Sequence, residues 1–426
     1  MSQAMRILLS LIGGLVLGIA AAEWGDGWAS WGEAVAQPIG TAWLNGLQMT
    51  IVPLVVSLLV IGIAATADAA RAGQLAGRAM AMFLTVLWGG AILAALLTPL
   101  LLKTWPIDPH AAAALKAALA DTKPVGDVAP FSDVIAAMVP NNPVTAAANN
   151  AFLPLVVFTL AFAFAITRLP GDQRQLLTGF FRAIADAMLV VIGWVLALAP
   201  LGVAALAFLV GAKAGTAAFG ALLHYVLIVS SVGLAVWAFA YPVGIIGGRV
   251  GIRRFLRASA PSQAVAISTQ SSLASLPAML SGAEQAGVPA QTAGITLPLA
   301  VAIFRSTGPA MNLAVAIYVA SWFGMQLTAA NLAAGVIVAS ITTLGAVSLP
   351  GSISFVSSIA PIAAAMGVPI APLGLLVAIE TFPDIIRTLG NVTWDLATTT
   401  ALSARAMPAQ IIEEDLLAAP PATARR

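Results

Sequence analysis

Apolar segments long enough to cross a lipid bilayer recur along the whole chain, and they restrict the fold more than any other feature. We place eight of them, at residues 5–22, 44–66, 79–102, 152–167, 184–211, 218–247, 290–320 and 372–402. About 20 apolar residues in a helix span a hydrocarbon core of about 30 Å. Only 8% of the 426 residues are charged, against about 25% in soluble domains. The sequence therefore predicts an all-α integral membrane protein with eight transmembrane helices.

Basic side chains predict the orientation of these spans, because loop lysine and arginine residues favour the cytoplasmic side of a membrane. If the spans alternate, the loop arginines fall together on one side, and the other side holds Lys103, Lys116, Lys123 and Lys213. The arginine-rich side also contains both ends of the chain. We therefore expect a multi-pass protein of the plasma membrane or bacterial inner membrane with cytoplasmic N- and C-termini.

The last apolar segment carries a stripe of polar and charged side chains. Glu380, Asp384, Arg387, Asn391 and Asp395 follow one another at spacings of four, three, four and four residues, which places them on one face of a helix. A charge at the centre of a membrane helix costs about 2.5 to 3.5 kcal/mol on insertion scales. These groups are therefore expected to face a polar cavity that binds a charged solute.

Two further apolar segments, 258–288 and 331–370, are interrupted by hydroxyl-bearing residues and proline. The interruptions contain Gln270, Ser271, Ser272, Ser275 and Pro277 in the first segment, and Ser348, Pro350, Gly351, Ser352 and Ser354 in the second. Non-helical backbone at membrane depth is tolerated where it lines a cavity or is buried in protein. We interpret both segments as re-entrant helical hairpins at a binding site. Surface loops between short spans, with the serines acting as helix caps, are the alternative.

These motifs together resemble the dicarboxylate/amino acid:cation symporter family, which includes the glutamate transporters. The stretch from Asp384 to Asp395 is similar to the family's last-helix pattern D-x-x-R-T-x-x-N-x-x-x-D, and Thr269–Pro277 resembles the serine-rich tip of its first hairpin. Leu349-Pro350-Gly351 resembles the tip of the second hairpin, and Gln48–Leu54 resembles the second-span pattern K-M-x-x-x-P-L. The resemblance runs in order from about residue 5 to residue 405.

The resemblance implies an inverted-repeat elevator transporter that assembles as a homotrimer. The implied scaffold consists of residues 1–76 with spans 1 and 2 and residues 103–217 with spans 4 and 5. The implied transport domain combines span 3 at 77–102 with residues 218–405, which hold span 6, the first hairpin, span 7, the second hairpin and span 8. The tail at 406–426 is expected to be cytoplasmic and disordered.

The resemblance also implies roles for individual residues. Asp384 would hold a substrate amino group, Arg387 would bind a carboxylate, and Thr388 and Asn391 would complete the pocket. The hairpin tips would add Ser271, Ser272, Ser348, Pro350 and Gly351, and Asp395 is similar to a sodium ligand. Glutamate, aspartate or a C4-dicarboxylate is the expected substrate, and the pairing of Asp384 with Arg387 favours an acidic amino acid. A structural Asp384–Arg387 ion pair and interfacial pairing of Asp395 are the alternatives.

The seventh span departs from the family pattern. Where relatives carry N-M-D-G-T, this chain has Arg305-Ser306-Thr307-Gly308 preceded by Phe304. The aspartate of that pattern is therefore absent from this chain. Because hard cations need oxygen ligands, its loss removes a carboxylate that would bind sodium. We expect sodium coupling to be weakened or lost, with Arg305 and Ser306 taking over charge compensation.

The coupling mechanism follows from the same substitution. We expect Arg305 to pair with Asp395 or Glu380, because a buried carboxylate needs a counter-ion. Glu380 is the predicted proton carrier of a proton-coupled transporter or an exchanger. Sodium symport through the remaining ligands is the alternative, and so is a non-transporting membrane sensor derived from the family.

Other function classes receive no support from the sequence. The two histidines, His110 and His224, fall in a loop and in a span away from the serine-rich segments, and the chain has no cysteine. We therefore expect no enzymatic activity, no cofactor and no nucleic-acid partner. The expected partners are the solute, a proton or sodium ion, and the lipid bilayer.

Overall fold

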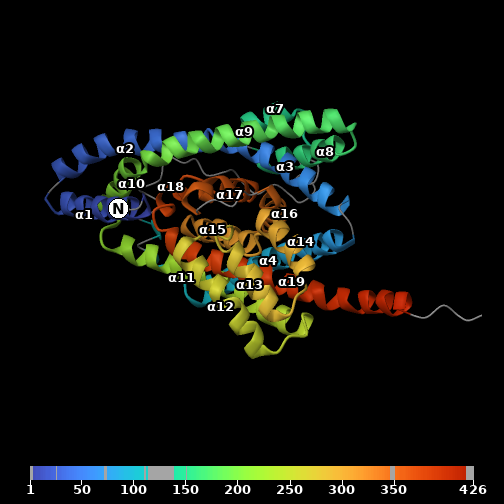
Figure 1. Ribbon diagram of the computed structural model, residues 1–426. Coiled ribbons are helices and arrows are strands. Elements are labelled where there is room, and N and C mark those ends of the chain that lie inside the picture. Colours follow the sequence, from blue (N-terminus) through green and yellow to red (C-terminus); the bar gives the residue numbers. More distant parts are fainter. Residues whose placement is uncertain are drawn as a thin grey trace, which may run out of the picture.

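A computed structural model describes residues 3–24, 26–71, 74–109, 112–113, 139–149, 151–345 and 351–418 (Figure 1). Within these ranges the chain forms helices joined by short connections, without strands, which confirms the all-α prediction. The first half contains α1 (Gln3–Glu23), α2 (Asp26–Gln48), α3 (Ile51–Arg71), α4 (Gln74–Thr104), α7 (Pro143–Ala148), α8 (Phe152–Ile166), α9 (Gly171–Ala197) and α10 (Ala199–Ala214). The second half contains α11 (Ala217–Pro242), α12 (Ile252–Thr269), α13 (Leu276–Ala286), α14 (Ala290–Ile303), α15 (Gly308–Trp322), α16 (Ala329–Thr342), α17 (Gly351–Ala365), α18 (Pro372–Leu376) and α19 (Thr381–Ala418).

Six helical segments of the described chain are long and apolar enough to cross a membrane. They are Met5–Glu23, Gly27–Asp68, Gln74–Thr104, Gly171–Ala197, Ala218–Gly247 and Ala290–Trp322. Of the eight expected spans, the one at 152–167 corresponds to α8, which has 15 residues. The one at 372–402 begins as the short helix α18 and continues in α19, the helix that carries the charged stripe.

Proline positions explain two differences from the predicted spans. The segment 44–66 is divided between α2 and α3, which separate around Met49 and Thr50. Pro53 stands in the first turn of α3 and has no N–H to bond a carbonyl one turn back, so the preceding helix ends there. Pro200 has the same effect between α9 and α10. Residues 26–43, which lie between the first two expected spans, are helical and form most of α2.

The helices pack in two groups whose arrangement is visible in Figure 1. In the first group α1 and α2 lie against α10, and α3 lies against α8 and α9. In the second group α4 and α11 pack against α15 and α19, with α12 and α13 beside them. The interior helix α15 is buried along nearly its whole length. This grouping does not test the predicted scaffold and transport domains, which stay a prediction.

Both segments predicted as re-entrant hairpins contain pairs of helices. α12 and α13 contact each other across the turn at 270–275, and α16 contacts α17. Gln270 adopts a left-handed backbone conformation with φ of 51° and ends α12. The backbone of α19 continues as helix to Ala418, so the first part of the predicted disordered tail is helical.

Candidate functional site

The connection between α14 and α15 interrupts the predicted seventh span where the chain departs from the family pattern. α14 ends at Ile303 and α15 begins at Gly308. Phe304 has extended backbone angles, φ −105° and ψ 91°, and its ring stacks on Phe83 of α4 at a centroid distance of 4.3 Å. The interruption is therefore anchored to α4 on one side.

Hydrogen bonds to α19 anchor the other side of this connection. Asn391 Oδ1 accepts from Ser306 Oγ at 3.2 Å, from the Thr307 backbone N–H at 3.1 Å and from Thr307 Oγ1 at 2.9 Å. The Thr307 hydroxyl also lies 2.9 Å from the backbone carbonyl of Arg387. Asn391 is thus a structural acceptor for the broken span, and these contacts place the neighbouring Arg305 beside the start of α19.

Glu380, directly before α19, and the first two turns of α19 hold a cluster of charged side chains. Arg387 Nη1 donates to Glu380 Oε1 and, at 3.2 Å, to Asp384 Oδ1. Tyr225 of α11 donates its hydroxyl to Glu380 Oε2 at 3.2 Å. Glu380 is 0% exposed, Asp384 5% and Arg387 7%. A single buried cation is therefore shared by two carboxylates, one of which also has a phenolic donor.

The outer edge of the Arg387 guanidinium has no partner among the described residues. Nε and Nη2 are buried and form no hydrogen bond. Two neighbouring N–H groups on one edge of a guanidinium match the two oxygens of a carboxylate. Arg387 therefore keeps a bidentate donor edge free while Nη1 is held by Glu380 and Asp384.

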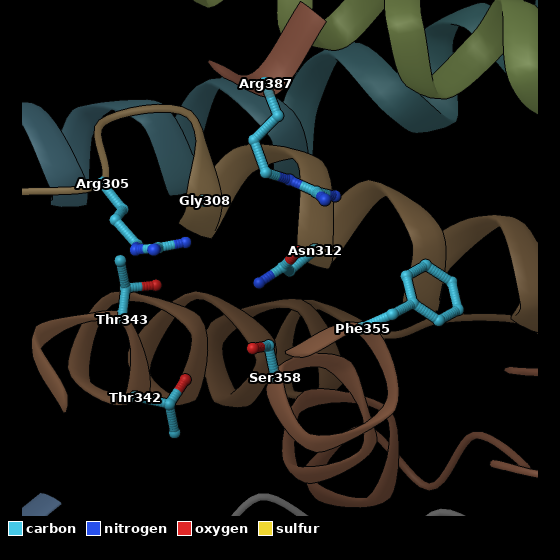
Figure 2. A pocket seen from close by; sticks show the side chains of 8 residues that line it. All are labelled: Arg305, Gly308, Asn312, Thr342, Thr343, Phe355, Ser358 and Arg387. Carbon is cyan, nitrogen blue, oxygen red and sulfur yellow. The ribbon is translucent and has the colours of Figure 1, made fainter. Parts of the chain in front are cut away.

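Arg387 and a second arginine, Arg305, line one cavity, as Figure 2 shows. Arg305 extends from the α14–α15 connection, Arg387 from α19, and both guanidinium groups point into the space above α16 and α17. Asn312, Thr343, Phe355 and Ser358 complete most of the lining. The space open to water-sized molecules is about 20 Å³, which is room for about one water molecule. A larger anion requires these walls to separate.

Arg305 does not form the ion pair that the sequence suggested. No described carboxylate lies within 4.0 Å of it, and its buried Nε has no hydrogen-bond partner. Glu380 is already held by Arg387 and Tyr225. Asp395 is 0% exposed, and neither of its carboxylate oxygens has a hydrogen-bond partner in the described part of the chain.

The remaining predicted site residues lie in different surroundings. Ser271 and Ser272 are half-buried in the turn between α12 and α13. The Ser271 hydroxyl accepts from the Ala274 backbone N–H at 3.2 Å, which is the local capping role considered as the alternative. Neither serine lines the cavity of the two arginines. Thr388 is 5% exposed, and its hydroxyl donates to the Asp384 carbonyl at 2.9 Å.

Part of the second predicted hairpin tip cannot be placed. Ser348 and Pro350 lie outside the described residues, and Gly351 is the first residue of α17. The tip's predicted role in binding a substrate therefore stays a prediction.

Sequence reasoning missed several residues that the structure places at the site. Asn312 and Thr343 line the cavity, and Tyr225 holds Glu380. Asn312 follows Arg305 by seven residues, which is two helical turns, in an otherwise apolar run. That isolated polar side chain was a usable signal, whereas the link from Tyr225 to Glu380 crosses 155 positions of sequence.

The fold and the site define a multi-pass membrane protein with broken helices around buried charges, an arrangement found in membrane transporters. The model of the sodium:dicarboxylate symporter family matches residues 4–405. The chain therefore belongs to that family.

Curated relatives of the chain match it over nearly its whole length. A proton/glutamate-aspartate symporter of Escherichia coli K12 is 26% identical over 92% of this chain and 90% of its own. A C4-dicarboxylate transport protein of Leptothrix cholodnii is 26% identical over 91% of this chain and 85% of its own. A proton/sodium-glutamate symport protein of Bacillus subtilis is 26% identical over 92% and 89%.

Proposed function

We propose that the protein is a secondary active transporter that moves a small anionic solute, either an acidic amino acid such as glutamate or aspartate or a C4-dicarboxylate. One observation carries this proposal. Arg387 is 7% exposed, and two buried nitrogens on one edge of its guanidinium have no hydrogen-bond partner in the part of the chain that the structure describes. Such an edge binds a carboxylate bidentately. The substrates named for the relatives all carry two carboxylates.

The proposed mechanism is elevator transport by a homotrimer with both termini in the cytoplasm, as the family resemblance implies. Separation of the helices into an α1–α2–α10 group and an α4–α11–α15–α19 group supports a moving unit that packs against a static one.

We place the coupling cation at Asp395 instead of Glu380. Glu380 already has a guanidinium and a phenol as partners, whereas Asp395 is fully buried and neither of its carboxylate oxygens has a hydrogen-bond partner within the described ranges. An isolated buried carboxylate is unfavourable unless it is neutralised. A proton or a sodium ion bound there would neutralise its charge.

The test is uptake by proteoliposomes containing the purified full chain. Labelled glutamate, aspartate and succinate are supplied separately, first with a sodium gradient, then with choline in place of sodium, and then with a pH gradient alone. Saturable uptake of one of them supports the proposal, and Arg387→Gln should abolish it. Absence of uptake of all three under every gradient would contradict transport and favour a sensor.

A separate variant tests the proposal that the coupling cation binds at Asp395. Asp395→Asn should abolish the dependence of uptake on the pH or sodium gradient while leaving exchange of internal for external substrate. Glu380→Gln should keep the gradient dependence. The opposite result would return the coupling role to Glu380.

A further inference from the structure

We infer that Arg305 is a substrate-binding residue, and that Arg305 and Arg387 form a clamp in which each guanidinium binds one carboxylate of a C4-dicarboxylate without an amino group. This inference rests on the proposed transport function and selects one substrate class within it. It gives Arg305, which lies in the interruption of the seventh span, a role in selecting the substrate.

Two independent anchors fix the position of Arg305. Phe304 is stacked on Phe83 at 4.3 Å, and Ser306 and Thr307 are hydrogen-bonded to Asn391. Because the residues on both sides are held, the backbone of Arg305 is fixed next to α19. The contact between the Thr307 hydroxyl and the Arg387 carbonyl, 2.9 Å, ties the two arginine positions together directly.

Both guanidinium groups point into one cavity and both have unused donors. Arg387 presents Nε and Nη2, and Arg305 presents Nε, all of them buried and without a hydrogen-bond partner among the described residues. Arg305 forms no ion pair within 4.0 Å among the described residues. Arg387 is already paired with Glu380 and Asp384, whereas the charge of Arg305 is not paired in this way, so its burial is more favourable when an anion lies beside it. A solute with a carboxylate at each end satisfies both.

The charge pattern disfavours an ammonium group at this position. Asp384 Oδ1 already accepts from Arg387, and a substrate ammonium beside Arg305 would meet a guanidinium with no described carboxylate within 4.0 Å. Asn312, Thr343 and Ser358 supply neutral polar groups around the cavity, which can complete the hydrogen bonds of carboxylate oxygens. The site therefore matches a plain dicarboxylate better than glutamate or aspartate.

The experiment compares succinate with succinamate, in which one carboxylate is replaced by an uncharged amide. Wild-type protein in proteoliposomes should show a KM for succinamate at least about tenfold above that for succinate, because one charge-assisted pair is lost. It should also prefer succinate to glutamate. Arg305→Gln should raise the KM for succinate at least about tenfold but change that for succinamate less than about threefold, which removes the discrimination.

Two further variants distinguish an effect on substrate binding from an effect on folding. Arg305→Lys keeps the charge without the bidentate fork, so it should give an intermediate KM for succinate. Arg253→Gln changes an exposed arginine of α12 and should leave both KM values unchanged. If Arg305→Gln does not fold, the Tm of wild-type protein in detergent should still rise more with succinate than with succinamate.

The outcomes of these measurements are distinct. Equal effects of Arg305→Gln on both solutes, or a wild-type preference for glutamate, would overturn the clamp while leaving transport intact. Equal Tm shifts with succinate and succinamate would also overturn the clamp and leave the proposed transport function intact. Lack of uptake of succinate, glutamate and aspartate by the wild type would instead contradict the proposed function.

Discussion

Replacing Arg387 with glutamine should destabilise the protein strongly, because it removes the cation shared by two buried carboxylates. Glu380 and Asp384 are 0% and 5% exposed, and both accept from Nη1 of Arg387. Removing one partner of a buried ion pair costs about 3 to 5 kcal/mol. The Tyr225 hydroxyl donates to Glu380 with or without Arg387, so it does not change this difference. We therefore expect a loss of about 3 to 5 kcal/mol in the free energy of unfolding.

The assay is thermal unfolding of purified protein in detergent, followed by tryptophan fluorescence. A loss of 1 kcal/mol lowers Tm by about 2 to 4 °C in domains of about 150 to 250 residues and by less in longer chains. Arg387→Gln should therefore lower Tm by about 5 °C, and the control Arg253→Gln, on an exposed side chain, by less than about 1 °C.

A double variant tests the physical cause. Glu380→Gln alone should cost less than about 1 kcal/mol, because it removes one of two carboxylates that share one cation. Adding it to Arg387→Gln should restore about 1 to 3 kcal/mol relative to the sum of the single effects, since one unpaired buried charge disappears. Strictly additive effects, or an Arg387→Gln protein as stable as the control, would refute the reasoning.

Two other predictions concern the interruption of the seventh span. Gly390→Ala should lower stability by about 1 to 3 kcal/mol, because a Cβ there would overlap the methyl group of Thr307. In the matched control Gly294→Ala, the added Cβ has no neighbour within 4 Å. An equal Tm for both variants would contradict the expectation. Phe304→Ala should lower stability by about 3 to 5 kcal/mol through loss of the stacked pair with Phe83, both rings being 1% exposed; a change in detergent Tm below about 2 °C would show that the ring does not anchor the interruption.

Helical periodicity and hydropathy are local properties, so the sequence by itself determined the all-α membrane fold, the broken segments and the polar stripe of the last helix. The spacing of Asp384, Arg387 and Asn391 was sufficient to place them on one face. The seventh span was expected to run unbroken from 290 to 320, and the structure interrupts it between Ile303 and Gly308.

Only the tertiary structure decided which charges meet. The sequence offered Arg305 as the partner of Glu380 or Asp395, but the guanidinium that reaches Glu380 belongs to Arg387, and Tyr225 arrives from a helix distant in sequence. Ion-pair partners are selected by side-chain positions at a scale of about 3 to 4 Å. Those positions depend on how α11, α15 and α19 pack, which no local pattern in the chain specifies.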